Sequence, residues 1–359
     1  MDKEKWLMAA TGVIIGGLAV LLVALGNPAN MGICIACFLR DIAGGIGLHR
    51  AGIVQYIRPE LIGLAFGAFI SAFSAKEFRS RGGSATMVRF VLGVFMMIGA
   101  LVFLGCPLRD LLRISGGDLN AVVGLVGFLA GVLYGVYFLK KGFNLGAART
   151  EKTTQVGGYM LVLGAALLLG LLLAGIDFNP AGGGPLFFSK EGPGSQHAPI
   201  WIALFAGMVV GFLAQKTRMC LSGGFRDFFL IREYGLLIAY GCILVTALVL
   251  NIFLGKFNLG FANQPVAHSN HIFNFLGLFL LGQCAVLLGG CPLRQIVLGS
   301  EGDTDASVTV MGMIFGAAIA HNFMLASSAK GTTIFGEVVV IAGVIIVSLI
   351  GWVYQEVDS

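Results

Sequence analysis

The sequence predicts an all-α polytopic membrane protein with about ten transmembrane helices in two inverted repeats of five spans. Composition is the first observation, because the 359 residues are 57% hydrophobic and only 11% charged, whereas soluble domains carry roughly 25% charged residues. Glycine is the second, because 54 glycines suit membrane helices whose backbones pack closely. The third is a motif, Gly-Cys-Pro-Leu-Arg, that occurs at Gly105–Arg109 and again at Gly290–Arg294.

Apolar stretches of roughly 17 to 25 residues have the length that a helix needs to cross a bilayer. They lie near residues 6–25, 58–75, 87–105, 120–139, 156–176, 199–215, 234–254, 272–289, 305–325 and 334–354. Other segments are too short to cross, namely residues 34–48, their counterpart at 220–230, and the segments directly after the two motifs. Broken helices at membrane depth are tolerated where they are buried or line a cavity. We therefore expect these short re-entrant helices to build a transport site.

The two halves are related by a nearly constant shift in residue number. Cys106 and Cys291, for example, differ by 185. We assign a first transmembrane repeat to residues 1–176, an external linker to 177–198 and a second transmembrane repeat to 199–359. With five spans in each half, the second half enters the membrane from the opposite side, so the predicted repeats are inverted.

The placement of basic residues predicts the orientation. The linker contains Lys190 as its only Lys or Arg, whereas the loops predicted on the other side contain Lys76, Arg79, Arg81, Arg89, Lys140, Lys141, Arg149, Lys152, Lys216, Arg218 and Arg232. Basic loops remain on the cytoplasmic side. We therefore expect a multi-pass protein of the inner (plasma) membrane with cytoplasmic N- and C-termini. The net charge of +5 is spread over short loops, so we expect no nucleic-acid partner.

The repeated motif predicts a short helix that starts inside the membrane. Gly105 permits a break, Cys106 falls at the helix cap, and Pro107 suits the first helical position. A thiol there faces the positive end of the helix dipole and unpaired backbone N–H groups, which favours a thiolate or a bound anion. Arg109 adds a positive charge about one turn away, unless it only snorkels to the surface. The same roles are expected of Gly290, Cys291, Pro292 and Arg294.

A second pair of cysteines occupies equivalent places in the two halves. Cys34 precedes Arg40 and Asp41, and Cys220 precedes Arg226 and Asp227 at the same distances. We interpret the Arg-Asp pairs as structural bracing, and the cysteines as transport-site candidates. The other cysteines, Cys242 and Cys284, lie inside unbroken spans without a cysteine at the repeat-related position and are interpreted as packing residues.

Cys34 and Cys37 also form a Cys-x-x-Cys pair, which leaves two further interpretations open. It could be a redox dithiol or a soft-metal site. Residue 223, which corresponds to Cys37 in the second half, is Gly, so the shared architecture does not require the second thiol. Cys37 is therefore retained as a candidate transport residue with an open redox role.

These residues resemble the YeeE/YedE family of membrane transporters for sulfur compounds. The resemblance covers nearly the whole chain and rests on the duplicated Gly-Cys motif, the cysteines followed by Arg-Asp, and the two-half architecture. It implies an hourglass-shaped protein of inverted repeats that passes a thiosulfate-type anion between cysteines at a central constriction. It also implies a small cytoplasmic sulfur-carrier protein as a soluble partner. The Pro-Leu-Arg after each motif cysteine is similar to the subgroup proposed to transport a selenium compound.

Two function classes follow from these residues. The first is a permease for a small sulfur- or selenium-containing anion, with the lipid bilayer as its surroundings and neither a cofactor nor a resident metal. The alternative is a membrane thiol-disulfide oxidoreductase that uses Cys34 and Cys37. Such an enzyme is expected to expose a second cysteine pair in a loop, and the sequence contains none. Since nucleotide-binding motifs are also missing, we expect a transporter and not an enzyme.

Overall fold

The computed structural model describes residues 3–150, 154–174 and 186–355. Within these ranges the chain is helical and contains only isolated β-bridges. The helices are α1 (Lys3–Ala24), α2 (Ile35–Gly45), α3 (Pro59–Ser74), α4 (Thr86–Phe103), α5 (Pro107–Ser115), α6 (Leu119–Lys140), α7 (Thr154–Gly157), α8 (Met160–Leu173), α9 (Ile200–Lys216), α10 (Leu221–Ile231), α11 (Gly235–Phe253), α12 (His271–Leu287), α13 (Pro292–Ser300), α14 (Thr304–Asn322) and α15 (Ile334–Val353). The predicted all-α class is confirmed for the described residues.

Every apolar stretch predicted to span the membrane contains a helix, and the boundaries differ by a few residues. Seven stretches of the described residues have the length and hydropathy of a span: Lys3–Ala24, Thr86–Ser115, Leu119–Lys140, Ile200–Ile231, Gly235–Phe253, His271–Ser300 and Ile334–Val353. The helices α3 and α8 are apolar but shorter. The chain is thus a helical protein with several membrane-spanning candidates, and the number of ten spans remains a prediction.

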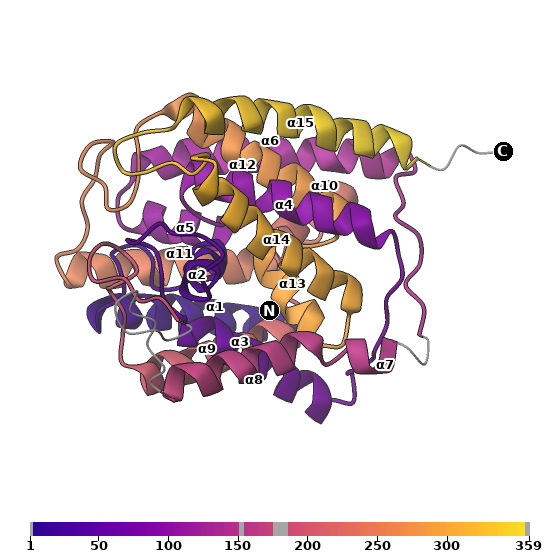
Figure 1. The fold of residues 1–359 in the computed structure, drawn as a ribbon, viewed down its shortest axis with the longest axis horizontal. Helices are drawn as coiled ribbons and strands as arrows, with labels where there is room; N and C mark the ends of the chain where they lie inside the picture. Colours follow the sequence, from indigo (N-terminus) through magenta and orange to yellow (C-terminus); the bar gives the residue numbers. More distant parts are fainter. Residues whose placement is uncertain (1–2, 151–153, 175–185, 356–359) are drawn as a thin grey trace.

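The helices of each half pack on helices of the other half. The first predicted span of one half packs on the second of the other, and the third packs on the fourth. α1 packs against α11 and α3 packs against α9, while α4 packs against α14 and α6 packs against α12 (Figure 1). Within each pair the backbones approach at glycines. A Cβ on Gly127 or Gly131 of α6 would collide with backbone atoms of Phe275 or Phe279 on α12. Glycine allows this contact because it has no Cβ, and such small residues let membrane helices approach closely.

The equivalent helices α1 and α9 run in opposite directions. The end of α1 lies beside the start of α9, where the Ala198 N–H donates to the Asn27 side chain at 2.8 Å. The same asparagine donates to Glu60 at the start of α3 at 2.7 Å. Since α3 and α9 pack side by side in the same direction, with Gly63 against Leu204 and Gly67 against Met208, α1 is antiparallel to both.

The segment before α9 is not a free linker. Its part at residues 177–185 lies outside the described residues, but residues 186–198 pack on the loop between α2 and α3. Phe187 donates its N–H to the Gly45 carbonyl at 2.8 Å, and Ser189 donates to the Gln55 carbonyl at 2.9 Å. This loop pairing forms one end of the molecule.

Basic loops gather at another end. The backbone of Asn144 donates to Tyr354 at the end of α15, and Gly82 pairs with Arg149. Arg81 forms an ion pair with Asp303 at 2.9 Å. The loop after α6 therefore lies beside the C-terminal end of α15 (Figure 1), and the loop after α3 lies beside the loop after α6 and the start of α14.

Candidate functional site

Four cysteines cap the starts of four short helices. Cys34 precedes α2, Cys106 precedes α5, Cys220 precedes α10 and Cys291 precedes α13, each with an extended backbone at the cap. Proline occupies the first position of α5 and α13, where its missing N–H costs no helical hydrogen bond. The predicted short helices with cysteine caps are therefore present in both halves.

Cys34, Cys37 and Cys106 form the first thiol cluster, at the starts of α2 and α5. The Cys34 sulfur accepts the Cys37 N–H at 3.3 Å, and its side chain interacts with that of Cys106. The Cys106 thiol lies against the backbone N–H groups of Ala36 and Arg109. Two helix starts from different parts of the first half thus converge on this group of sulfurs.

Cys220 and Cys291 form the second thiol cluster, at the starts of α10 and α13. The Cys220 sulfur accepts the Gly223 N–H at 3.3 Å and the Cys291 N–H at 3.4 Å. It also lies 3.2 Å from the Ser222 hydroxyl. Gly223 occupies the position that Cys37 has in the first cluster. A backbone N–H therefore donates to the cap sulfur in both halves, whereas only the first half has a second thiol at this position.

Both clusters are closed from the surroundings. Cys34 and Cys106 are 0% and 1% exposed, and Cys220 and Cys291 are 5% and 3% exposed. Each cluster combines the positive ends of two helices with soft, polarizable sulfur. Such a place attracts an anion and accepts hydrogen-bonding contact with its atoms. A solute can reach it only if the surrounding helices separate.

Tyr240 on α11 lies near both clusters. Its side chain is within electrostatic range of Cys220 and Cys291 as well as Cys106, and the residue is only 3% exposed. α11 packs against both α5 and α10, so it connects the two sets of short helices. Sequence analysis did not select Tyr240, because an isolated tyrosine in an apolar span carries no local signal.

The two motif arginines have different surroundings. Arg109 is fully buried and donates to the Cys37 sulfur at 3.5 Å, the Asn30 carbonyl at 3.2 Å, the Val266 carbonyl at 3.2 Å and the Leu104 carbonyl. Arg294 forms an ion pair with Glu301 at 3.1 Å. Neither side chain snorkels to the surface. Only Arg109 brings its charge to a thiol without a carboxylate partner among the described residues.

The motif glycines act differently from the expectation. The left-handed residue at each break is Leu104 or Gly289, with φ of 67° and 77°, and not Gly105 or Gly290. A Cβ on Gly290 would lie 2.8 Å from the Arg294 side chain, and a Cβ on Gly105 would lie 3.1 Å from that of Arg109. These glycines therefore leave room for the arginine that folds back over the break.

The Arg-Asp pairs form as expected, but only the first is deeply buried. Asp41 accepts hydrogen bonds from Arg40 at 2.7 Å and from Arg58 at 2.7 Å, and all three residues are at most 2% exposed. Arg58 also donates hydrogen bonds to the carbonyls of Pro193 and Gln196. In the second half the Arg226 side chain lies 2.8 Å from Asp227, and both are about 30% exposed. Within the described ranges, this second pair has no further arginine.

Three more buried charges lie at or after the first motif, namely Asp110, Arg113 and Asp118, and none of them is among the predicted site residues. Arg113 forms an ion pair with Asp118 at 2.7 Å, with both side chains 0% exposed. Asp110 is also 0% exposed. The available signal was the run Arg-Asp-Leu-Leu-Arg inside a segment too apolar for surface charges. Intramembrane charges of this kind are costly and usually functional.

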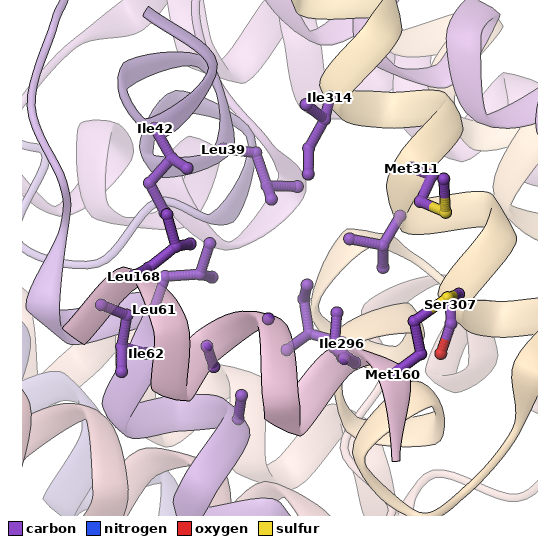
Figure 2. Close-up of a pocket in the computed structure, with 15 residues that line it drawn as sticks. Leu39, Ile42, Leu61, Ile62, Met160, Leu168, Ile296, Ser307, Met311 and Ile314 are labelled. Atoms are coloured by element: carbon purple, nitrogen blue, oxygen red, sulfur yellow. The ribbon is translucent and has the colours of Figure 1, made fainter. Parts of the chain in front are cut away.

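A cavity of about 300 Å³ lies between α2, α3, α8, α13 and α14. Figure 2 shows that its wall is built from aliphatic side chains and methionines, among them Leu39, Ile42, Ile296 and Met311, with Ser307 as a polar exception. None of its lining residues is a cysteine. Because it offers an anion no positive charge and almost no hydrogen bonds, it is not the candidate site.

The second half of the chain is similar to proteins of known type. Residues 216–352, which include the second thiol cluster, match the model of a family described as sulphur transport. The thiosulfate transporter TsuA of Spirochaeta thermophila is 31% identical over 108 residues, which cover 30% of this chain and 32% of that relative. The similarity thus spans about a third of the relative's length. Residues 216–352 are therefore similar to the sulphur transport family, which agrees with the resemblance carried by the duplicated cysteine motif.

Proposed function

We propose that the protein is a membrane permease for a small sulfur- or selenium-containing anion of the thiosulfate type. The observation that carries the proposal is the convergence of paired helix starts on Cys34 and Cys106 in one cluster and on Cys220 and Cys291 in the other. The relative TsuA, which is named as a thiosulfate transporter, supports the same substrate class.

In this proposal the anion passes from one thiol cluster to the other. Helix dipoles and Arg109 attract the charge, and the sulfurs exchange hydrogen bonds with the solute at each step. Arg294 is already paired with Glu301, so it supports the second cluster mainly by neutralising that carboxylate. Tyr240 stands at the passage between the clusters. A small sulfur-carrier protein receives the anion on the cytoplasmic side.

Alternating access gives this path a physical basis. The exchanged packing of the halves and the opposite directions of α1 and α9 support two inverted repeats. Two such bundles can rock against each other around a fixed central site. The basic loops beside the end of α15 support a cytoplasmic C-terminus in the inner membrane. A tag at Glu191 should then be reached from outside and a tag at Gly83 only from inside; labelling of both from one side would contradict this topology.

The decisive experiment is uptake of labelled thiosulfate, selenite and sulfite by vesicles that contain the protein. We expect uptake of at least one anion, and its loss in Cys106→Ala and in Cys291→Ala at matched membrane levels. Cys284→Ala is the control, because Cys284 is equally buried but lies outside both clusters. Its uptake should stay within a few-fold of the parent, since it loses mainly packing.

The thiol oxidoreductase is the weaker alternative. The matched family and the relative are both described as transport proteins. If the Cys106→Ala and Cys291→Ala double variant retained normal uptake, the thiols would be packing residues and the proposed path would be wrong.

A further inference from the structure

Asp110 is a buried carboxyl group that the proposed path does not use. It lies in the first turn of α5 and is 0% exposed, and neither of its oxygens has a hydrogen-bond partner among the described residues. A lone carboxylate at such depth is costly because it has lost its hydration without gaining a partner. The group must therefore be neutralised or transiently paired.

Two ionisable side chains interact with Asp110 in the part of the chain that the structure describes. Arg113 lies on the same helix and Asp118 starts α6, and both interact with Asp110 electrostatically. Arg113 directs its Nε to Asp118 and one terminal nitrogen to the Phe103 carbonyl, and its remaining terminal nitrogen has no partner among the described residues. His268, from the loop before α12, interacts with Arg113 and Asp118. One guanidinium thus faces two carboxylates, and one proton makes this group neutral.

The second half shows what a neutral residue does at the same place. Gln295 corresponds to Asp110 and donates its amide to the carbonyls of Leu288 and Gly290, each at 3.2 Å. Leu288 and Gly290 lie at the second break, as Phe103 and Gly105 lie at the first. An uncharged side chain with a donor is therefore compatible with this architecture, and the carboxyl of the first half is a specific difference between the halves.

We propose that Asp110 binds the proton whose movement drives anion uptake. The inference rests on the proposed permease function and names its coupling ion. The set of Arg113, Asp110 and Asp118 has one net negative charge when Asp110 is ionised. A proton taken up from the outer side by the Asp110 carboxylate removes that charge, and Arg109, which interacts with Arg113, is then less compensated.

This charge change couples the proton to the anion. Arg109 lies 3.5 Å from the Cys37 sulfur, so a more positive set favours an anion at the first thiol cluster. By linkage, the bound anion favours the protonated carboxyl to the same degree. The proton and the anion then move in the same direction, and both are released on the inner side.

The test uses the full chain in proteoliposomes with labelled thiosulfate as the probe, selenite and sulfite being tried if thiosulfate is not exchanged. Two quantities are measured: accumulation driven by an imposed inward proton gradient, and exchange of labelled for unlabelled anion without a gradient. The parent should accumulate the anion above equilibrium and lose this accumulation with a protonophore. Asp110→Gln, which introduces the side chain that Gln295 has in the second half, should only equilibrate the anion but keep exchange within about threefold of the parent. Asp110→Glu should restore gradient-driven accumulation.

Asp305→Asn is the matched control. Asp305 is 2% exposed, but its oxygens accept hydrogen bonds from Gly83 and Ser84. The Asp305→Asn variant should keep the parent's ratio of gradient-driven accumulation to exchange. The inference is overturned if Asp110→Gln still accumulates the anion, if it loses exchange together with accumulation, or if the parent exchanges the anion but ignores the proton gradient. A parent that exchanges none of the anions would instead contradict the permease function itself.

Discussion

The two thiol clusters share one construction but differ in the charges behind them. Behind the first cluster lie the Arg40, Asp41 and Arg58 group and the run of charges on α5, all sealed from the surroundings. Behind the second lie a partly exposed Arg226–Asp227 pair and the Arg294–Glu301 pair. The two halves therefore share the helix starts and thiols as a common frame, while the buried charge is concentrated in the first half. In the proposed path, the first cluster is therefore the place where charge would control transport.

The largest expected effect compares the two aspartates. Asp41→Asn leaves two buried arginines without their carboxylate, and loss of one partner of a buried ion pair costs about 3 to 5 kcal/mol. Asp227→Asn removes a pair that is about 30% exposed, and such pairs contribute about 0 to 1 kcal/mol. Thermal unfolding in detergent should show a large loss for the first variant and a small one for the second. Equal losses would mean that burial does not distinguish the halves.

The second effect concerns the thiols of the first cluster. Cys34→Ser keeps a hydrogen-bonding group but loses the polarizable sulfur that meets Cys106, so uptake should fall. Cys37→Ser should be tolerated, because the cap sulfur keeps the backbone N–H of residue 37, as it has that of Gly223 in the second half, and a Ser hydroxyl can replace the thiol in the side-chain hydrogen bond to Cys34. Uptake at matched membrane levels measures both. Equal loss, together with a solute-dependent Cys34–Cys37 bridge on a thiol-labelling gel, would instead favour the redox alternative.

The smallest effect compares two loop histidines, His49 after α2 and His268 before α12. Each ring has one nitrogen near a backbone carbonyl and accepts a backbone N–H at the other, from Ala51 and Asn270 respectively. Burial lowers the pKa of both imidazoles from the ordinary 6.5.

The unfolded chain therefore takes up protons first as the pH falls. The stability that the neutral histidines contribute is complete above about pH 6.5 and is lost as the pH falls from there toward the lower folded pKa. We expect the unfolding midpoint to drop by ~2 to 4 °C on acidification to about pH 5, and the drop to shrink in the His49→Gln, His268→Gln double variant. A midpoint that rises on acidification would contradict this assignment.

Local patterns in the sequence were sufficient for the fold class, the positions of the helices and the caps at Cys106 and Cys291. Hydrophobic runs of fixed length specify helices in a membrane, and Cys-Pro after a break specifies a helix start, because these effects depend on neighbouring residues alone. Asp118 and Asp303 cap α6 and α14, and each accepts a backbone N–H from its own helix.

Only the tertiary structure decided which of these residues act together. Three contacts join different parts of the chain: Cys34 with Cys106, Asp41 with Arg58, and Tyr240 with the cysteines of both clusters. Burial made the same distinction for charges: Arg109 and Arg294 are equivalent in sequence, but of the two only Arg294 has a carboxylate, Glu301, within reach among the described residues. Sequence specifies each helix start by local chemistry, whereas the free energy of a buried charge depends on partners that only the folded chain brings close.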